Sequence, residues 1–164
     1  SGGMRQRAMI ALALACSPKL LLADEPTTAL DATVQIQILL LLRELQRELG
    51  MSIIFVTHDV GVATEIADEL AVMYAGKIVE IGDVADVIKK PAHPYTQGLL
   101  SSTVNSESKG KRLEVIGGSP PDMSKLFKGC AFSPRCKKVL DQCWHQKPAP
   151  ESLSTNQIAS CFNI

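Results

Sequence analysis

The chain of 164 residues is long enough for one domain or one and a half, and its apolar content of 46% can fill a core. Its 17 basic and 17 acidic residues balance, which argues against broad electrostatic attraction to nucleic acid or anionic lipid. The longest strongly apolar run, Ile38 to Leu42, is far shorter than the roughly 20 residues of a membrane span.

The first part of the chain alternates between helical and strand-like patterns. We expect, in order, a helix over 1–15, a buried strand over 19–24, a helix over 31–49, a buried strand over 52–56, a helix over 60–70, and a hairpin of strands 70–74 and 77–81. Ser1 is placed to cap the first helix, and Gly50 to end the second. Alternating helices and buried strands are typical of a parallel α/β sheet with flanking helices.

The composition changes after Gly82. Short helices are expected over 83–90 and 94–103, a polar linker over 105–112, and a short strand over 112–116. Residues 117–164 are rich in Gly, Pro and Cys with little periodicity, which predicts an irregular segment that needs a staple to order it. Cys16, at the end of an apolar helix, is expected to be a small buried core residue.

Two adjacent carboxylates, Asp24 and Glu25, end the apolar run that starts at Leu20. Phosphoryl transfer to water needs a metal held against the phosphates and a group that orients the attacking water. A strand-end carboxylate can reach Mg²⁺, and the next residue points elsewhere. The pair therefore predicts Asp24 on the metal side and Glu25 as general base, although an exposed acid pair is an equal alternative for this motif alone.

Two further polar positions suit a bound phosphate, and a third, Asp31, is placed to cap a helix. Ser1-Gly2-Gly3 stands at a helix N-terminus, which favours anions, and ordinary capping is compatible with this. His58 follows a strand end, where a neutral imidazole can donate one hydrogen bond to a phosphate oxygen; a lone histidine can also be structural. Asp31 is placed as an N-cap of the helix that follows it.

Four cysteines form a local pattern in the last 35 residues: Cys130, Cys136, Cys143 and Cys161, spaced C-x5-C-x6-C-x17-C. Four thiolates suit tetrahedral Zn²⁺ or a [4Fe–4S] cluster. The intervals exceed the C-x2-C of common zinc ribbons, and spacing alone leaves iron–sulfur, zinc and unliganded thiols equally open. His145 could replace one cysteine in a Cys3His zinc site.

Four motifs in order resemble the signature loop, Walker B, D-loop and H-loop of an ABC-transporter ATPase: Ser1-Gly2-Gly3-Met4-Arg5-Gln6-Arg7, 20–27, Leu30-Asp31 and Thr57-His58-Asp59. The resemblance covers residues 1 to about 90. It implies ATP and Mg²⁺ as cofactors, Glu25 and His58 as catalytic residues, and as cofactor-binding residues Ser1, Gly2, Gly3, Gln6, Asp24 and Asp31. In that family two ATPase subunits pack head to tail, and each signature loop closes over the nucleotide of the other.

No Gly-x-x-x-x-Gly-Lys phosphate-binding loop occurs in the sequence. We therefore expect a C-terminal portion of a longer protein, which by itself would not hydrolyse ATP. The expected fold is the C-terminal part of a P-loop-type ABC ATPase parallel sheet with flanking helices, plus an irregular cysteine-containing extension. The expected division is residues 1–84 for the C-terminal half of the nucleotide-binding domain and 85–164 for the extension.

Residues 90–100, which contain His93-Pro94-Tyr95-Thr96, resemble the signature extension of oligopeptide and dipeptide importer ATPases. Helix initiation by Pro94 is the simpler interpretation of this stretch. In those ATPases the pattern Gly-Cys-x-Phe-x-Pro-Arg-Cys, matched here by residues 129–136, carries an iron–sulfur cluster in some members. The resemblance therefore favours a [4Fe–4S] cluster over zinc.

The resemblance implies an ATP-hydrolysing subunit that powers import of peptides, or of a related small solute such as nickel, at the cytoplasmic face of the plasma (inner) membrane. The implied partners are a second ATPase subunit, identical or paralogous, transmembrane permease subunits and, indirectly, an extracytoplasmic solute-binding protein. A soluble ABC ATPase acting on nucleic acid is an alternative, which the neutral charge opposes. A metal-sensing regulatory fragment is another, which the intact Asp24, Glu25 and His58 oppose.

Overall fold

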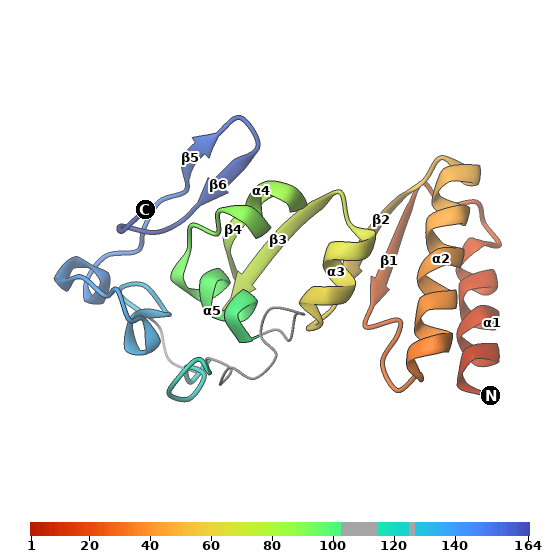
Figure 1. Ribbon diagram of the computed structural model, residues 1–164, viewed down its shortest axis with the longest axis horizontal. Coiled ribbons are helices and arrows are strands. Elements are labelled where there is room, and N and C mark those ends of the chain that lie inside the picture. The colour runs from red at the N-terminus through yellow and green to blue at the C-terminus, as the bar shows by residue number, and fades with distance from the viewer. Residues whose placement is uncertain (103–114, 125–126) are drawn as a thin grey trace. The chain divides into compact units, whose positions relative to one another are not determined.

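The computed structural model describes residues 1–102, 115–124 and 127–164. These divide into two compact units, Ser1–Ile66 and Ala67–Ile164 (Figure 1). The linker expected over 105–112 and most of the strand expected over 112–116 lie outside the described residues. The predicted division between residues 84 and 85 falls within the second unit and stays a prediction.

The first unit is built around a parallel pair of strands. Its elements are α1 (Gly2–Leu14), β1 (Leu20–Asp24), α2 (Ala32–Leu49), β2 (Ser52–Val56) and α3 (Val60–Ile66). The two strands pair from Leu20 opposite Ser52 to Asp24 opposite Val56. Their carboxyl ends therefore meet at one edge, as the predicted α/β class requires.

Local signals set the helix ends. The Met4 N–H donates to Ser1 Oγ at 3.4 Å, and the Val34 N–H donates to Asp31 Oδ1 at 3.0 Å, so both predicted caps form. Gly50 ends α2 with a φ of 60°, in the left-handed conformation that glycine adopts without a steric penalty. The helix predicted over 60–70 is too long, because α3 ends at Ile66.

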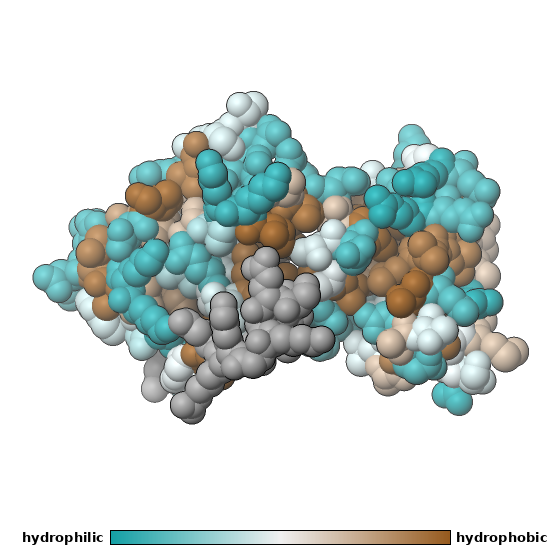
Figure 2. Space-filling view, viewed as in Figure 1, coloured by the Kyte–Doolittle hydropathy of each residue, from teal (hydrophilic) through white to brown (hydrophobic). Residues whose placement is uncertain are grey.

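The core of the first unit lies between the helices and one face of the strand pair, where Ile10, Leu21, Ile38, Leu42 and Met51 are buried. The expectation that the strands are buried throughout is wrong for alternate residues. Side chains alternate across a strand, and those on the second face are open, with Leu22 69% and Ile54 52% exposed. Figure 2 also shows apolar surface over α2, where Leu40 is exposed.

Cys16 does not occupy the core position expected for it. Its side chain is exposed. The helix α1 ends at Leu14, and Cys16 lies in the turn that follows, outside the packed face of the helix. The apolar sequence of α1 predicted a buried side chain at Cys16, although the helix ends before that residue.

The second unit contains a four-stranded antiparallel sheet in the order β3-β4-β6-β5. Its elements are β3 (Glu69–Tyr74), β4 (Lys77–Asp83), α4 (Val84–Lys89), α5 (Pro94–Ser102), the 3₁₀ helices η2 (Ser133–Arg135) and η3 (Asp141–Trp144), β5 (Glu151–Ser154) and β6 (Gln157–Ala159). The predicted hairpin of β3 and β4 turns at Ala75 and Gly76. Both have positive φ, as a type I′ turn requires.

The β5–β6 hairpin was not predicted. Strand β6 pairs with β4 from Glu80 opposite Ala159 to Gly82 opposite Gln157, which adds two strands to the sheet. Gly82 permits this approach, because a Cβ there would overlap the carbonyl oxygen of Asn156. Sheet pairing therefore orders part of the segment that was expected to be irregular.

An aromatic cluster forms the core of the second unit. The ring centroids of Tyr74 and Tyr95 are 4.6 Å apart, and Phe132 lies 5.1 Å from Tyr74 and 5.4 Å from Tyr95. Arg135 packs over Tyr74 and donates hydrogen bonds to the carbonyl oxygens of Ile116 and Gly117. The cluster joins β3, α5 and the cysteine-containing segment.

Candidate functional site

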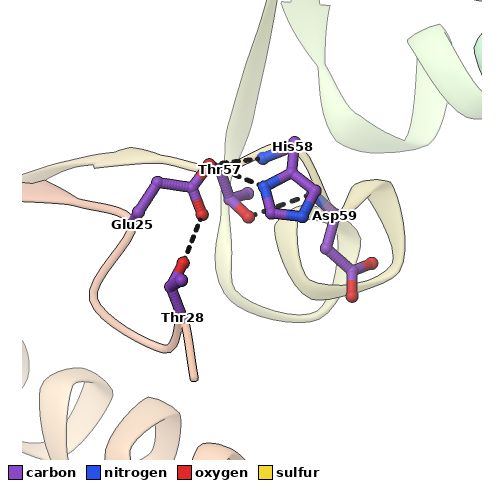
Figure 3. Close-up of polar contacts among 5 residues, drawn as sticks. All are labelled: Glu25, Thr28, Thr57, His58 and Asp59. Atoms are coloured by element: carbon purple, nitrogen blue, oxygen red, sulfur yellow. Dashed lines mark hydrogen bonds and ion pairs between the residues drawn. The ribbon is translucent and has the colours of Figure 1, made fainter. Parts of the chain in front are cut away.

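The parallel register brings Glu25 and His58 together just beyond the ends of β1 and β2 (Figure 3). Glu25 Oε1 lies 2.8 Å from His58 Nδ1 and accepts the His58 backbone N–H at 3.1 Å. The second oxygen, Oε2, accepts a hydrogen bond from Thr28 Oγ1 at 2.8 Å. The side chains remain open to solvent, with His58 82% and Glu25 36% exposed. The carboxylate is thus oriented by protein contacts yet accessible to a ligand.

The backbone of Glu25 is held in an unfavourable conformation. Its φ is 48°, in the left-handed region that residues with a side chain rarely adopt. The Glu25 N–H donates to the carbonyl oxygen of Val56 at 2.9 Å, which continues the strand pairing by one bond. Strain of this kind is common at functional sites, where surrounding contacts enforce it.

The pair of side chains shifts the pKa of each partner. The hydrogen bonds from His58 and then from Thr28 lower the pKa of Glu25, so the carboxylate is ionised at neutral pH. The hydrogen bond to Glu25, followed by the charge of that carboxylate, raises the pKa of His58. A neutral His58 that donates from Nδ1 to Glu25 has no proton left on Nε2. In this arrangement, therefore, only the imidazolium can also donate to a phosphate oxygen, which modifies the expectation for a neutral ring.

The signature-loop residues lie beside the start of α2. A Cβ on Gly3 would be 2.6 Å from Val34 Cγ1, and one on Gly2 would be 3.1 Å from Leu30 Cδ2. Gly3 is therefore needed for the packing of α1 against α2, independently of any bound anion, and the fit at Gly2 is tight. The sequence predicted only a nucleotide-binding role for these two glycines.

The structure places the other predicted nucleotide-site residues on the same unit. Asp24 is exposed at the end of β1, Gln6 is half-buried on α1, and Asp31 caps α2. Thr28 was not predicted to take part. Its position in the turn after the two carboxylates was the available signal, because a hydroxyl three residues on can reach back to Glu25.

The four predicted metal ligands line one pocket in the second unit: Cys130, Cys136, Cys143 and Cys161, together with His93 and Phe132. Backbone N–H groups donate to three of the sulfur atoms at 3.4 Å, from Lys138 to Cys136, from Leu140 to Cys143 and from Asn163 to Cys161. Burial raises the pKa of Cys130, Cys136 and Cys161. A metal at these positions would therefore have to displace protons.

Four thiols in one pocket have the donor set of either of two kinds of metal centre. Zn–S bonds of about 2.3 Å in a tetrahedron require sulfur atoms within about 4 Å of one another. No group of three or more His, Cys, Asp or Glu residues in 1–102, 115–124 and 127–164 is arranged to hold a metal ion. A [4Fe–4S] cluster binds each thiolate to a different iron, so its thiolates converge at a wider spacing. His145 is exposed and is not among the residues that line the pocket.

Gly129 allows the first and third cysteines to approach. The Cys130 N–H donates to the Cys143 carbonyl oxygen at 2.8 Å, and a Cβ on Gly129 would overlap that oxygen. We expect Gly129→Ala to lower the free energy of unfolding by about 1–3 kcal/mol, as overpacking typically does. Chemical denaturation measures this, with Gly117→Ala as control because nothing lies within 4 Å of its Cβ position. Equal stability of the two variants would contradict this account of Gly129.

Comparisons with known proteins relate this chain to transport ATPases. The ABC transporter family model matches residues 1–28, and that of the oligopeptide/dipeptide transporter C-terminal region matches 79–143. The chain is similar to the oligopeptide transport ATP-binding proteins OppD of Salmonella typhimurium (51% identity, over 99% of the chain and 48% of that protein) and AppD of Bacillus subtilis (48% identity, over 99% and 49%). It spans about half the length of these curated relatives.

A solved structure is similar as well: cbiO1 from Clostridium perfringens, part of the ABC transporter complex cbiONQ. It is 38% identical, with a TM-score of 0.51, over 54% of this chain and 35% of that one. The fold is that of an ABC ATPase domain. Within that class the chain is similar to oligopeptide transport ATP-binding proteins, and it carries the match to the oligopeptide/dipeptide transporter C-terminal region. No helix within the described part of the chain is long and apolar enough to cross a membrane.

Proposed function

We propose that the protein containing this chain hydrolyses ATP between two ATPase subunits and powers import of oligopeptides or of a related small solute. Transmembrane permease subunits would form the path, an extracytoplasmic binding protein would deliver the solute, and this subunit would lie at the cytoplasmic face of the membrane. The observation that carries the proposal is Glu25, held between His58 and Thr28 at the end of β1. The similarity to oligopeptide transport ATP-binding proteins supports the choice of solute.

The residues of this chain divide the chemistry. Glu25 is ionised and accessible, so it can accept a proton from a water that attacks the γ-phosphate. Thr28 and the His58 N–H fix its two oxygens, and a protonated His58 would place a positive charge beside them. Asp24 is exposed at the adjacent position, where a carboxylate suits Mg²⁺. Bound ATP and Mg²⁺ would supply the phosphoryl group and neutralise its charge.

A chimera tests the proposal. This chain replaces the matching half of the Salmonella OppD, and uptake of a radiolabelled tripeptide is measured in cells that lack their own subunit. We expect uptake to be restored by the chimera and lost when it also carries Glu25→Gln. A chimera that assembles and hydrolyses ATP without peptide uptake would contradict the peptide assignment, and one that binds ATP without hydrolysis would contradict the catalytic one.

We further propose that Cys130, Cys136, Cys143 and Cys161 hold a [4Fe–4S] cluster. The four thiols line one pocket, and backbone N–H groups donate to three of the sulfur atoms. Bound there, the cluster would connect distant points of the C-terminal segment and offset part of the roughly 1–2 kcal/mol of entropy lost per ordered residue.

Cysteine variants test this second proposal. Anaerobically purified protein should be brown, with iron and sulfide in near-equal amounts. Cys143→Ser should bleach it and make residues 117–164 sensitive to protease, whereas Cys16→Ser should do neither, because Cys16 is exposed and outside the pocket. Colourless protein with one zinc per chain would indicate a zinc site, and an ordered segment with no metal would show that the cysteines only pack.

A further inference from the structure

His93 is buried beside the cysteines. His93 is 1% exposed, and its side chain lines the same pocket as the four thiols. Its ring centroid lies 5.8 Å from that of Phe132, which stands between Cys130 and Cys136 in the sequence. The motif around His93 takes no part in the chemistry proposed for ATP, so its position against the thiol pocket calls for a separate explanation.

A backbone contact determines which nitrogen of His93 carries a proton. Nδ1 accepts the Tyr95 N–H at 3.0 Å, so Nδ1 is unprotonated. The ring is therefore neutral, and its one proton is on Nε2. A protonated Nε2 is a hydrogen-bond donor and cannot be a metal ligand.

Glu80 fixes the segment that carries His93. The residue is 1% exposed. Its Oε2 accepts the His93 N–H at 2.9 Å, and its Oε1 accepts both the Ala92 N–H and Gln157 Nε2 at 2.8 Å. Gln157 belongs to β6, the strand that leads to Cys161. The Glu80 carboxylate thus links β4 to the His93 segment and to β6, the strand before Cys161. A buried hydrogen-bond network whose groups are all satisfied holds these segments in fixed positions.

We propose that His93 is a positioning residue of the cysteine site, whose Nε2–H donates a hydrogen bond to a sulfur atom in the pocket, either a cysteine Sγ or a sulfide of the cluster. The inference rests on the proposed [4Fe–4S] site. Hydrogen bonds to sulfur stabilise the more negative, reduced state, so this donor raises the reduction potential. The His93 motif thereby supplies a rigid N–H donor to the metal centre.

Potentiometric titration of the purified holoprotein tests the inference. We expect His93→Leu to shift the reduction potential to a lower value at unchanged iron content, and His93→Gln, which keeps an N–H donor, to recover part of the shift. Thr96→Val is the matched control three residues further along the chain, because Thr96 is buried and its hydroxyl has no hydrogen-bond partner among the described residues. A potential that is the same in wild type, His93→Leu and Thr96→Val would overturn the proposal.

A measurement on the wild type avoids dependence on how the variants fold. Hyperfine spectroscopy of the reduced holoprotein labelled with ¹⁵N-histidine should show one weakly coupled nitrogen with an exchangeable proton, lost in His93→Gln. No histidine coupling, or the strong coupling of a ligating nitrogen, would overturn the donor role while the cluster stands. Wild-type protein without iron and sulfide would instead overturn the cluster itself, and the role of His93 with it.

Discussion

Replacing Glu25 with Gln is expected to slow ATP hydrolysis by about 10²–10⁴-fold in a protein that joins this chain to a phosphate-binding loop, with ATP binding retained. Glutamine has the same size; its one oxygen can accept the His58 N–H, and its NH2 group can donate to the Thr28 hydroxyl oxygen. It cannot accept a proton from the attacking water at neutral pH. The uncleaved nucleotide should therefore hold the two ATPase subunits together.

Phosphate release, binding of a fluorescent ATP analogue and size-exclusion chromatography with ATP measure the three parts of this prediction. Glu48→Gln is the matched control, since Glu48 is an exposed carboxylate on α2 of the same unit. Glu48→Gln should leave turnover unchanged. Near-normal turnover in Glu25→Gln would assign the base to another group, and loss of ATP binding would indicate a structural role for Glu25.

The first unit could be predicted closely because its signals are local. A side-chain oxygen three residues before an N–H, as at Ser1 and Asp31, is enough to start a helix, and Gly50 is enough to end one. The carboxylate pair could be placed at a strand end for the same reason. That Glu25 and His58 meet depends on the parallel register, which follows once two successive strands flank a helix.

The parts that could not be predicted depend on distant residues. Strands β5 and β6 are too short for a period of two to be visible, and β6 is held by Gln157, which bonds Glu80 across 77 residues. Which face of β1 is buried depends on what packs there, so the apolar run alone overestimated its burial. Glu80 itself carries no sequence signal, because a glutamate in a strand is normally a solvent-facing residue.

Replacing Glu80 with Ala should strongly destabilise the second unit. The variant would leave the Ala92 N–H and the His93 N–H without an acceptor, and also one of the two Gln157 Nε2 hydrogens, since Nε2 keeps its bond to the Lys90 carbonyl oxygen. Each unsatisfied buried donor costs about 1–3 kcal/mol. Removing the buried charge offsets part of this, so we expect the free energy of unfolding to fall by about 3–5 kcal/mol, a large share of the stability of a typical domain.

Chemical denaturation followed by the fluorescence of Trp144, which belongs to the second unit, measures the loss. Glu69→Ala on the neighbouring strand β3 is the matched control, because Glu69 is exposed, and its effect should stay within about 0.5 kcal/mol. Glu80→Gln keeps one acceptor oxygen, so its loss of stability should lie between those of Glu80→Ala and Glu69→Ala. Because Gln157 would lose its bond to Glu80 and keep only the one to the Lys90 carbonyl oxygen, amide hydrogen exchange should also accelerate along β6 in Glu80→Ala. Unchanged exchange there, together with a stability equal to that of Glu69→Ala, would show that the carboxylate does not hold this segment.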